Sequence, residues 1–169
     1  MQDGGIGGIS GYTCIGALIS QCYNEGNLTI QITNPWSSIA GISGGMADEG
    51  TRIEQCYNTG NIEATSTVQN VRVCGISSFN EAQACGIDSC YNTGVMKLTV
   101  SGEGESCPVA AGIAGQMHPS GKYITNCYNI GKCSVIRNGS EWNVPRVGGI
   151  LGYADIDRCF KLLLANWHS

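Results

Sequence analysis

The tripeptide Cys-Tyr-Asn occurs four times in this chain of 169 residues. The copies begin at Cys22, Cys56, Cys90 and Cys127. The steps between them are 34, 34 and 37 residues, and a degenerate fifth copy, Cys159-Phe160, follows after 32 more. A period of this length is typical of repeat architectures, in which each unit buries its apolar face only by stacking on the next unit.

Other residue types recur at fixed distances from these cysteines. Ile stands three residues before each of them, at Ile19, Ile53, Ile87, Ile124 and Ile156. Gly stands four residues after the four complete copies, at Gly26, Gly60, Gly94 and Gly131. A Gly-Ile pair precedes each copy and begins at Gly8, Gly41, Gly75, Gly112 and Gly149. The unit therefore reads Gly-Ile-x-Gly, a variable loop, Ile-x-x-Cys-Tyr-Asn-x-Gly-x-ϕ-x-ϕ and a second variable loop, where ϕ is mostly apolar.

The pattern inside the unit predicts short β-strands. The ϕ positions alternate with mostly polar ones, which is the period of two expected for a half-buried strand. The Cys-Tyr-Asn stretch and the Gly-Ile-x-Gly stretch predict two further short strands, with Gly allowing a turn or a close approach of the backbone. The tail from Arg158 to Ala165 is the single helix candidate.

We therefore predict an all-β fold: a right-handed parallel β-helix (β-solenoid) with repeats of about 34 residues and three strands per coil. Residues 1–160 would form one solenoid domain, and residues 161–169 a C-terminal tail or short helical cap. Leu162, Leu163 and Trp167 would then cover the last coil. A less favoured interpretation splits each repeat into two small coils.

Stacked coils would place like side chains in rows, because parallel strands pair about 4.8 Å apart. The Cys row, made of Cys22, Cys56, Cys90 and Cys127, would run through the interior. The Asn row, made of Asn24, Asn58, Asn92 and Asn129, would lie at a bend and hydrogen-bond along the axis. The Tyr row, made of Tyr23, Tyr57, Tyr91 and Tyr128, would be a packing ladder.

One stretch of the chain resembles a known repeat. Gly41-Ile42-Ser43-Gly44, followed by the ten residues from Ile53 to Ile62, is similar to the GLUG repeat of adhesin-like bacterial surface proteins. The resemblance covers about residues 4–160. It implies a location at the cell surface or outside the cell and an adhesive or structural role, and it brings no catalytic residues. This chain departs from the motif by having Ile in place of Leu and by Ser78, where the last Gly is lost.

Charge and hydropathy predict the absence of several partners. The formal net charge is −4, so no basic surface supports nucleic-acid binding. No apolar run approaches the roughly 20 residues that a membrane-spanning helix needs. The N-terminus lacks a basic segment followed by an apolar run, so no signal peptide is visible in the sequence.

The ten cysteines admit three interpretations. Those in the repeated rows are predicted to be small buried hydrophobic residues with free thiols. Cys14, Cys74, Cys85 and Cys107 lie outside the main row and are the better disulfide candidates, with their redox state left open. No Cys-x-x-Cys pair occurs and His118 and His168 are the only histidines, so neither a metal nor another cofactor is predicted.

Two aromatic side chains are the ligand-binding candidates. Trp36 and Trp142 both fall in the loop that precedes a Gly-Ile pair, each close to a proline. Equivalent loops of a solenoid project on the same side, where an exposed Trp can stack on a sugar ring or anchor a protein. The alternative is that each Trp folds back over its own loop.

The predicted function is a non-catalytic extracellular module, for adhesion and binding or as a structural stalk, with a host glycan or protein as partner. The alternative is a polysaccharide-active enzyme, a glycosidase or lyase, using acids that share one column: Glu54, Asp88 and Asp157. A solvated strand face explains that column better, because no cluster of Arg, Lys or His accompanies the acids, so we predict no enzyme activity. The uncapped first coil predicts self-association through the solenoid ends.

Overall fold

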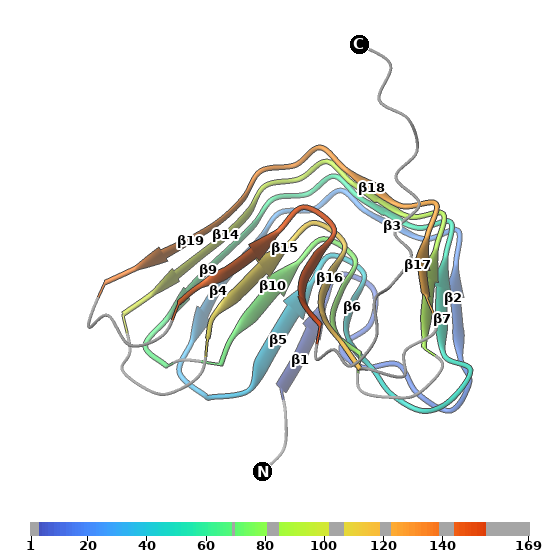
Figure 1. The fold of residues 1–169 in the computed structure, drawn as a ribbon, viewed down its shortest axis with the longest axis horizontal. Coiled ribbons are helices and arrows are strands. Elements are labelled where there is room, and N and C mark those ends of the chain that lie inside the picture. The colour runs from blue at the N-terminus through green and yellow to red at the C-terminus, as the bar shows by residue number, and fades with distance from the viewer. Residues whose placement is uncertain are drawn as a thin grey trace.

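The chain winds into stacked coils, each built from short parallel strands (Figure 1). This computed structural model describes residues 4–68, 70–80, 85–101, 107–118, 123–138 and 144–154. Within these ranges the fold is all-β, without a helix, and forms a β-solenoid of about four turns with repeats roughly 34 residues apart. The predicted fold class is thereby confirmed. The predicted helical cap and Leu162, Leu163 and Trp167 lie outside the described residues.

Five parallel sheets run along the solenoid axis, and we name them A to E. Sheet A contains β1 (Gly4–Gly7), β5 (Ser37–Ala40), β10 (Arg72–Cys74), β15 (Val109–Ala111) and β20 (Arg146–Gly148). Sheet B contains β6 (Ser43–Met46), β11 (Ser77–Asn80), β16 (Ala114–Met117) and β21 (Leu151–Ala154). Sheet C contains β2 (Leu18–Ser20), β7 (Arg52–Glu54), β12 (Gly86–Asp88) and β17 (Tyr123–Thr125).

The two remaining sheets follow the Cys of each repeat. Sheet D contains β3 (Tyr23–Asn24), β8 (Tyr57–Asn58), β13 (Tyr91–Asn92) and β18 (Tyr128–Asn129). Sheet E contains β4 (Leu28–Ile32), β9 (Ile62–Ser66), β14 (Met96–Val100) and β19 (Cys133–Arg137). Pairing is in register throughout, so that Tyr57 pairs with Tyr91 and Asn58 with Asn92. Like residues of successive repeats therefore stand above one another.

The prediction of three strands per coil is wrong, because two corners divide the expected strands. The residue before each Cys has a positive φ: 55° at Gln21, 54° at Gln55, 53° at Ser89 and 52° at Asn126. This left-handed residue ends the strand of sheet C before sheet D begins. The Gly-Ile pair forms the second corner, between β5 and β6 in the second coil.

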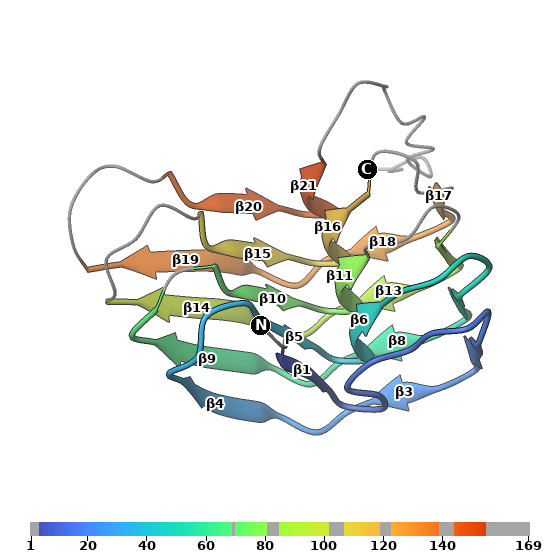
Figure 2. The ribbon, with the colours of Figure 1, turned by 90° about the horizontal axis from the view of Figure 1, so that it is seen from below.

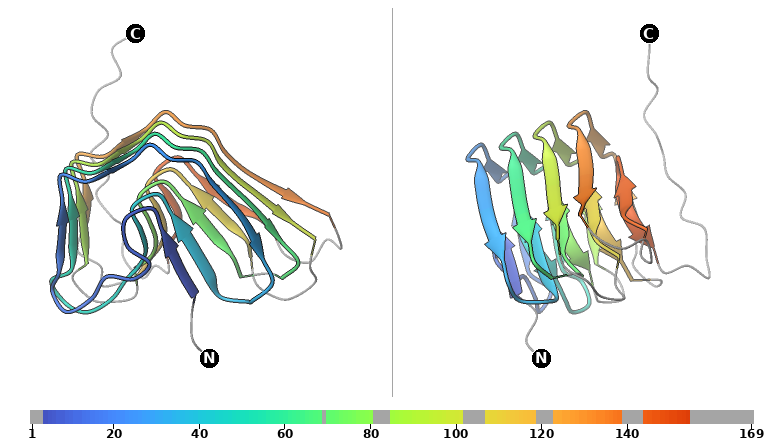
Figure 3. Two further views of the ribbon diagram at one scale, coloured as in Figure 1. Left: turned by 180° about the vertical axis from the view of Figure 1, so that it is seen from behind. Right: turned by 90° about the vertical axis from the view of Figure 1, so that its left-hand side faces the viewer.

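In cross-section the coil is bent into two arms (Figure 1; Figure 3, left). In one arm sheets A and E enclose an apolar cluster that includes Ile39, Ile62, Val73 and Leu98. In the other arm sheet B faces sheets C and D across a second cluster that includes Ile42, Ile53, Ile76 and Ile87. Neither cluster could be buried by a single coil, since each is made of residues from several coils.

The coils rise along one axis, with edge strands at the N-terminal end (Figure 2; Figure 3, right). Strands β1, β2, β3 and β4 are each paired on one side only among the described residues. Sheet B begins instead with two isolated bridges, from Ser10 to Ser43 and from Thr13 to Met46. The N-terminal coil thus leaves backbone groups and part of the apolar interior open.

Candidate functional site

The Asn row forms a continuous hydrogen-bonded ladder at the elbow between the two arms. Each side-chain Nδ2 donates to the Oδ1 of the next Asn at 2.7 Å, from Asn24 through Asn58 and Asn92 to Asn129. Each Nδ2 also donates to the carbonyl oxygen of the Gly two residues later, at 2.8 to 2.9 Å. Asn58 and Asn92 are fully buried. Their amides are satisfied because the next coil supplies an identical partner.

The Gly of each Gly-Ile pair lies against this ladder. A Cβ atom at Gly75 would lie 2.5 Å from Asn92 Cγ, and one at Gly41 would overlap the side chain of Asn58. The same contact recurs between Gly8 and Asn24 and between Gly112 and Asn129. The two sequence signatures of the repeat therefore touch, and Gly is required there because the backbone passes too close to the amides for any side chain.

The Cys row forms a second ladder beside the left-handed corner. The backbone N–H of each Cys donates to the Sγ of the Cys in the next coil, at 3.4 Å in all three steps. Each thiol donates in turn to the carbonyl oxygen two residues earlier, at 3.0 to 3.3 Å. The thiols thus satisfy backbone groups at this corner, which explains why a small side chain with a weak acceptor occupies the position.

All nine described cysteines are free thiols. Cys14, Cys74, Cys85 and Cys107, the candidates for disulfides whose redox state the sequence left open, are among them. Burial raises the pKa of Cys74 to about 12 and that of Cys133 to about 11. Hydrogen bonds with the thiols of Cys127 and Cys56, together with burial, raise the pKa of Cys90.

These raised pKa values predict slow alkylation of the folded protein. Because the thiolate is the reactive species, Cys74 is expected to resist iodoacetamide at pH 8 and to react fully after denaturation in urea. Half-buried Cys14 serves as the internal reference for reagent access. Peptide mass spectrometry of samples alkylated before and after denaturation measures both sites. Equal labelling of Cys74 in the two samples would contradict its placement in the core.

Of the acidic column considered for catalysis, Glu54 and Asp88 lie on sheet C and pair in register. Asp157 lies outside the described residues. Thr125 Oγ1 and Asn126 Nδ2 donate to Asp88 Oδ1, and Ser89 Oγ donates to its Oδ2 at 2.8 Å. These hydrogen bonds lower the pKa of Asp88, and the bond from Thr125 has the largest effect. Glu54 forms an ion pair with Arg52 at 3.2 Å. Asp88, which these hydrogen bonds hold ionised, is poorly suited to act as a general acid.

The Tyr row lies on the outer face of sheet D. Its rings stack with centroids 5.0, 4.8 and 5.0 Å apart, and every interplanar angle is 5°. Tyr23 and Tyr128, at the two ends, are 54% and 49% exposed. The rings therefore pack on one another as predicted, but they do so on the surface. Partial desolvation in the stack raises the pKa of Tyr57, and the negative charge of Glu25 adds a smaller increase.

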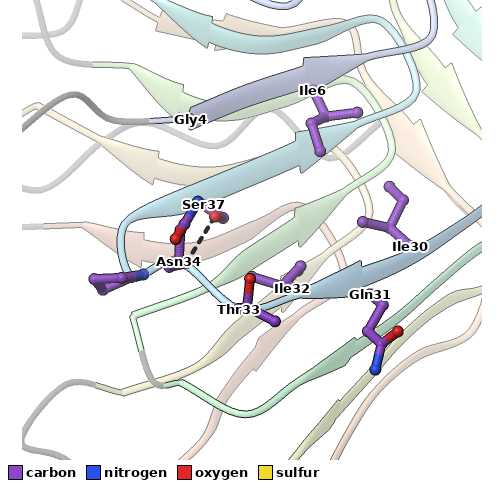
Figure 4. A pocket seen from close by; sticks show the side chains of 9 residues that line it. Gly4, Ile6, Ile30, Gln31, Ile32, Thr33, Asn34 and Ser37 are labelled. Carbon is purple, nitrogen blue, oxygen red and sulfur yellow. Dashed lines mark hydrogen bonds between the residues drawn. The ribbon is translucent and has the colours of Figure 1, made fainter.

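Trp36 lies beside a cavity of about 410 Å³ at the N-terminal end, between sheets A and E (Figure 4). Ile6, Ile30 and Ile32 supply apolar lining, while Gln31, Thr33, Asn34 and Ser37 supply polar groups. Ser37 Oγ donates to the Asn34 carbonyl oxygen at 2.9 Å (Figure 4). The lining includes Pro35 and Ser37, the chain neighbours of Trp36, but not Trp36 itself. Such a cavity can bind a small ligand, and its described lining contains no ionisable side chain.

The indole of Trp36 is 40% exposed, and the residue has a φ of 64°. Trp36 is thus neither buried under its own loop nor fully exposed to solvent. Trp142 lies outside the described residues.

Comparison with family models, curated proteins and solved structures found no match to this chain. The likeness to the GLUG repeat therefore stays a prediction. No helix among the described residues is long and apolar enough to cross a membrane. The same part of the chain contains no cluster of three or more His, Cys, Asp or Glu side chains that could hold a metal ion.

Sequence reasoning missed two features that bear on function. The left-handed corner is occupied by Gln, Gln, Ser and Asn, so no single residue type marks it. The exposure of the tyrosines could have been inferred from alternation: Cys and Asn point inward, so the Tyr between them points outward.

Proposed function

We propose that this chain is a non-catalytic extracellular repeat module that serves as an adhesive or structural stalk of a bacterial surface or secreted protein. The observation that carries the proposal is the Asn ladder, whose amides are hydrogen-bonded from coil to coil over the four complete repeats. An unbroken ladder of buried amides ties each coil to its neighbours. A stalk that holds a binding surface away from the cell needs this kind of axial continuity.

The loops that join sheet E to sheet A support a binding role. They comprise residues 33–36, 67–71, 101–108 and 138–145, so their length varies while the strands keep theirs. The loop of residues 33–36, which the structure describes in full, lies at the end of the arm formed by sheets A and E, between β4 and β5 (Figure 1). Variable loops on a fixed scaffold are the usual place for recognition, and Trp36 offers a half-exposed indole there. We propose a glycan or a host protein as the ligand.

Substitution of Trp36 tests the binding role. If the indole stacks on a sugar ring, Trp36→Ala is expected to weaken binding to the best ligand on a glycan array by roughly tenfold or more. Ile15→Ala is the matched control, because Ile15 is exposed in the same coil but lies in the loop between sheets B and C. Unchanged affinity of the Trp36 variant, or an equal loss in the control, would contradict the proposal.

The alternative enzyme function rests on the pairing of Glu54 with Asp88 on neighbouring coils. The same polysaccharides can be screened for chain cleavage by reducing-end assay. We expect no turnover. Turnover by the unmodified chain that is lost in the Glu54→Gln variant would show that the chain is a polysaccharide-active enzyme and not a stalk.

The open N-terminal coil predicts self-association. Ile6 is 40% exposed, and the apolar cavity opens beside it. We expect the molar mass in static light scattering to rise with concentration, because the edge strands β1 to β4 can pair with a second molecule. Ile6→Lys should shift the protein toward monomer, since a charge would enter that surface. A monodisperse monomer of the unmodified chain at high concentration would contradict this expectation.

A further inference from the structure

The Tyr row is a geometric arrangement that the proposed function does not use. Four phenol rings from four successive coils stack with centroids 4.8 to 5.0 Å apart and planes within 5° of parallel. Register fixes this arrangement, because Tyr23 pairs with Tyr57, Tyr57 with Tyr91 and Tyr91 with Tyr128. Each ring therefore faces the ring of the next coil.

The stack is also reachable from solvent. Tyr23 and Tyr128 are about half exposed, and Tyr57 and Tyr91 are partly exposed on the same outer face of sheet D. The side chains behind this face, Cys56 and Asn58 in the second coil, are fully buried. An oxidant in solution thus meets the phenols before it meets the thiol row.

We propose that the Tyr row is a site of oxidative dityrosine cross-linking between neighbouring coils. The oxidant is hydrogen peroxide used by a haem peroxidase. This inference goes beyond the proposed function and does not depend on it.

Each of two phenols loses one electron and its hydroxyl proton and becomes a phenoxyl radical. The two radicals form a carbon–carbon bond between positions ortho to oxygen, and the ring hydrogens at those positions move through solvent to the oxygens. The peroxide takes up two electrons and two protons and leaves as two waters. The protein loses two hydrogen atoms for each bond that forms.

Proximity makes the coupling intramolecular. Strand pairing keeps adjacent tyrosines together, so that a radical meets its neighbour in the same chain before it meets another chain. Bond formation needs the facing carbons to approach further, which rotation of these surface side chains allows. The product would join two coils covalently on the outer face, in addition to the hydrogen bonds of the interior.

The experiment treats the full chain at low concentration with peroxidase and hydrogen peroxide. We expect the fluorescence of dityrosine in the monomer fraction and an intact mass reduced by two hydrogens per cross-link. Trypsin cleaves after Arg52, Arg72, Lys97 and Lys122, which separates the four tyrosines of the row into four peptides. Mass spectrometry should therefore find linked peptides that contain neighbouring members of the row.

Two double variants decide the outcome. Tyr57→Phe/Tyr91→Phe keeps the stacked rings but leaves Tyr23 and Tyr128 three coils apart, so the intramolecular product should fall to the level of untreated protein. Tyr12→Phe/Tyr123→Phe removes two exposed tyrosines outside the row and should leave the yield unchanged. Far-ultraviolet circular dichroism verifies that each variant is folded. Cross-links found only between chains, or an undiminished yield in the first variant, would overturn the proposal.

Discussion

Replacing Asn58 by leucine is expected to lower the free energy of unfolding by about 3 to 5 kcal/mol. The substitution removes a buried amide and leaves three partners without it: Asn24 Nδ2, Asn92 Oδ1 and the Gly60 carbonyl oxygen. Each buried polar group that loses its hydrogen bond costs roughly 1 to 3 kcal/mol. The effect exceeds that of an ordinary hydrogen-bond deletion because the ladder is interrupted on both sides at once.

Urea unfolding followed by circular dichroism measures this effect as a fall in the transition midpoint. Asn61→Leu is the matched control, since Asn61 Oδ1 also accepts a hydrogen bond from the next coil, from Val95 N at 2.9 Å, but at an exposed position. There we expect a change of about 1 kcal/mol or less, because water replaces the lost partner. Equal destabilisation by the two variants would mean that the buried ladder has no special role.

Gly75→Ala is the second substitution with a large expected effect. Its new methyl group would overlap the Gly112 carbonyl oxygen and lie 2.5 Å from Asn92 Cγ and 2.6 Å from Asn92 Cβ. One obstacle is backbone and the other is a buried ladder amide, so neither can move without disturbing the next coil. Overpacking of this kind costs roughly 1 to 3 kcal/mol, and the rigid surroundings place Gly75 at the upper end of that range.

The control is another glycine of the Gly-Ile pairs. Gly149 is the residue equivalent to Gly75 two repeats later, and a Cβ atom there would meet nothing within 4 Å. Gly149→Ala is therefore expected to be neutral or stabilising by up to about 1 kcal/mol, because alanine restricts the unfolded chain. Thermal unfolding of both variants tests the difference. A loss at Gly149 as large as that at Gly75 would show that backbone flexibility, rather than contact with the Asn row, requires the glycine.

The repeat period predicted the solenoid and its rows because stacking converts sequence columns directly into spatial neighbours. The 34-residue step alone predicts that Cys56 lies above Cys22 and that Asn92 lies above Asn58. The number of strands per coil was not predictable in this way. It depends on the left-handed backbone at Gln55 and its equivalents, and different residue types adopt that conformation.

The candidate binding site was predictable only in part. The loop before Gly41, residues 33–36, lies where β4 turns back to β5, whereas the other loops of this column contain residues outside the described ranges. The exposure of Trp36 depends on the local loop conformation, including its φ of 64°, which no repeat column records. The contact of Gly75 with Asn92 likewise depends on how the coil bends at the elbow, and the spacing of the two motifs in the sequence does not record that bend.

Spacing between spin labels along one row tests the stacking of coils most directly. Gln31, Thr65, Thr99 and Ile136 occupy one row of sheet E, and a keto-bearing unnatural residue labelled with a nitroxide avoids the native thiols. Dipolar broadening in electron paramagnetic resonance should give about 10 Å for labels at 31 and 99 and about 14 Å for labels at 31 and 136, because each coil adds about 4.8 Å. Dilution with unlabelled protein removes contributions between molecules. Separations that do not grow with the number of coils, or no coupling at all, would contradict the stacked arrangement on which the proposed function rests.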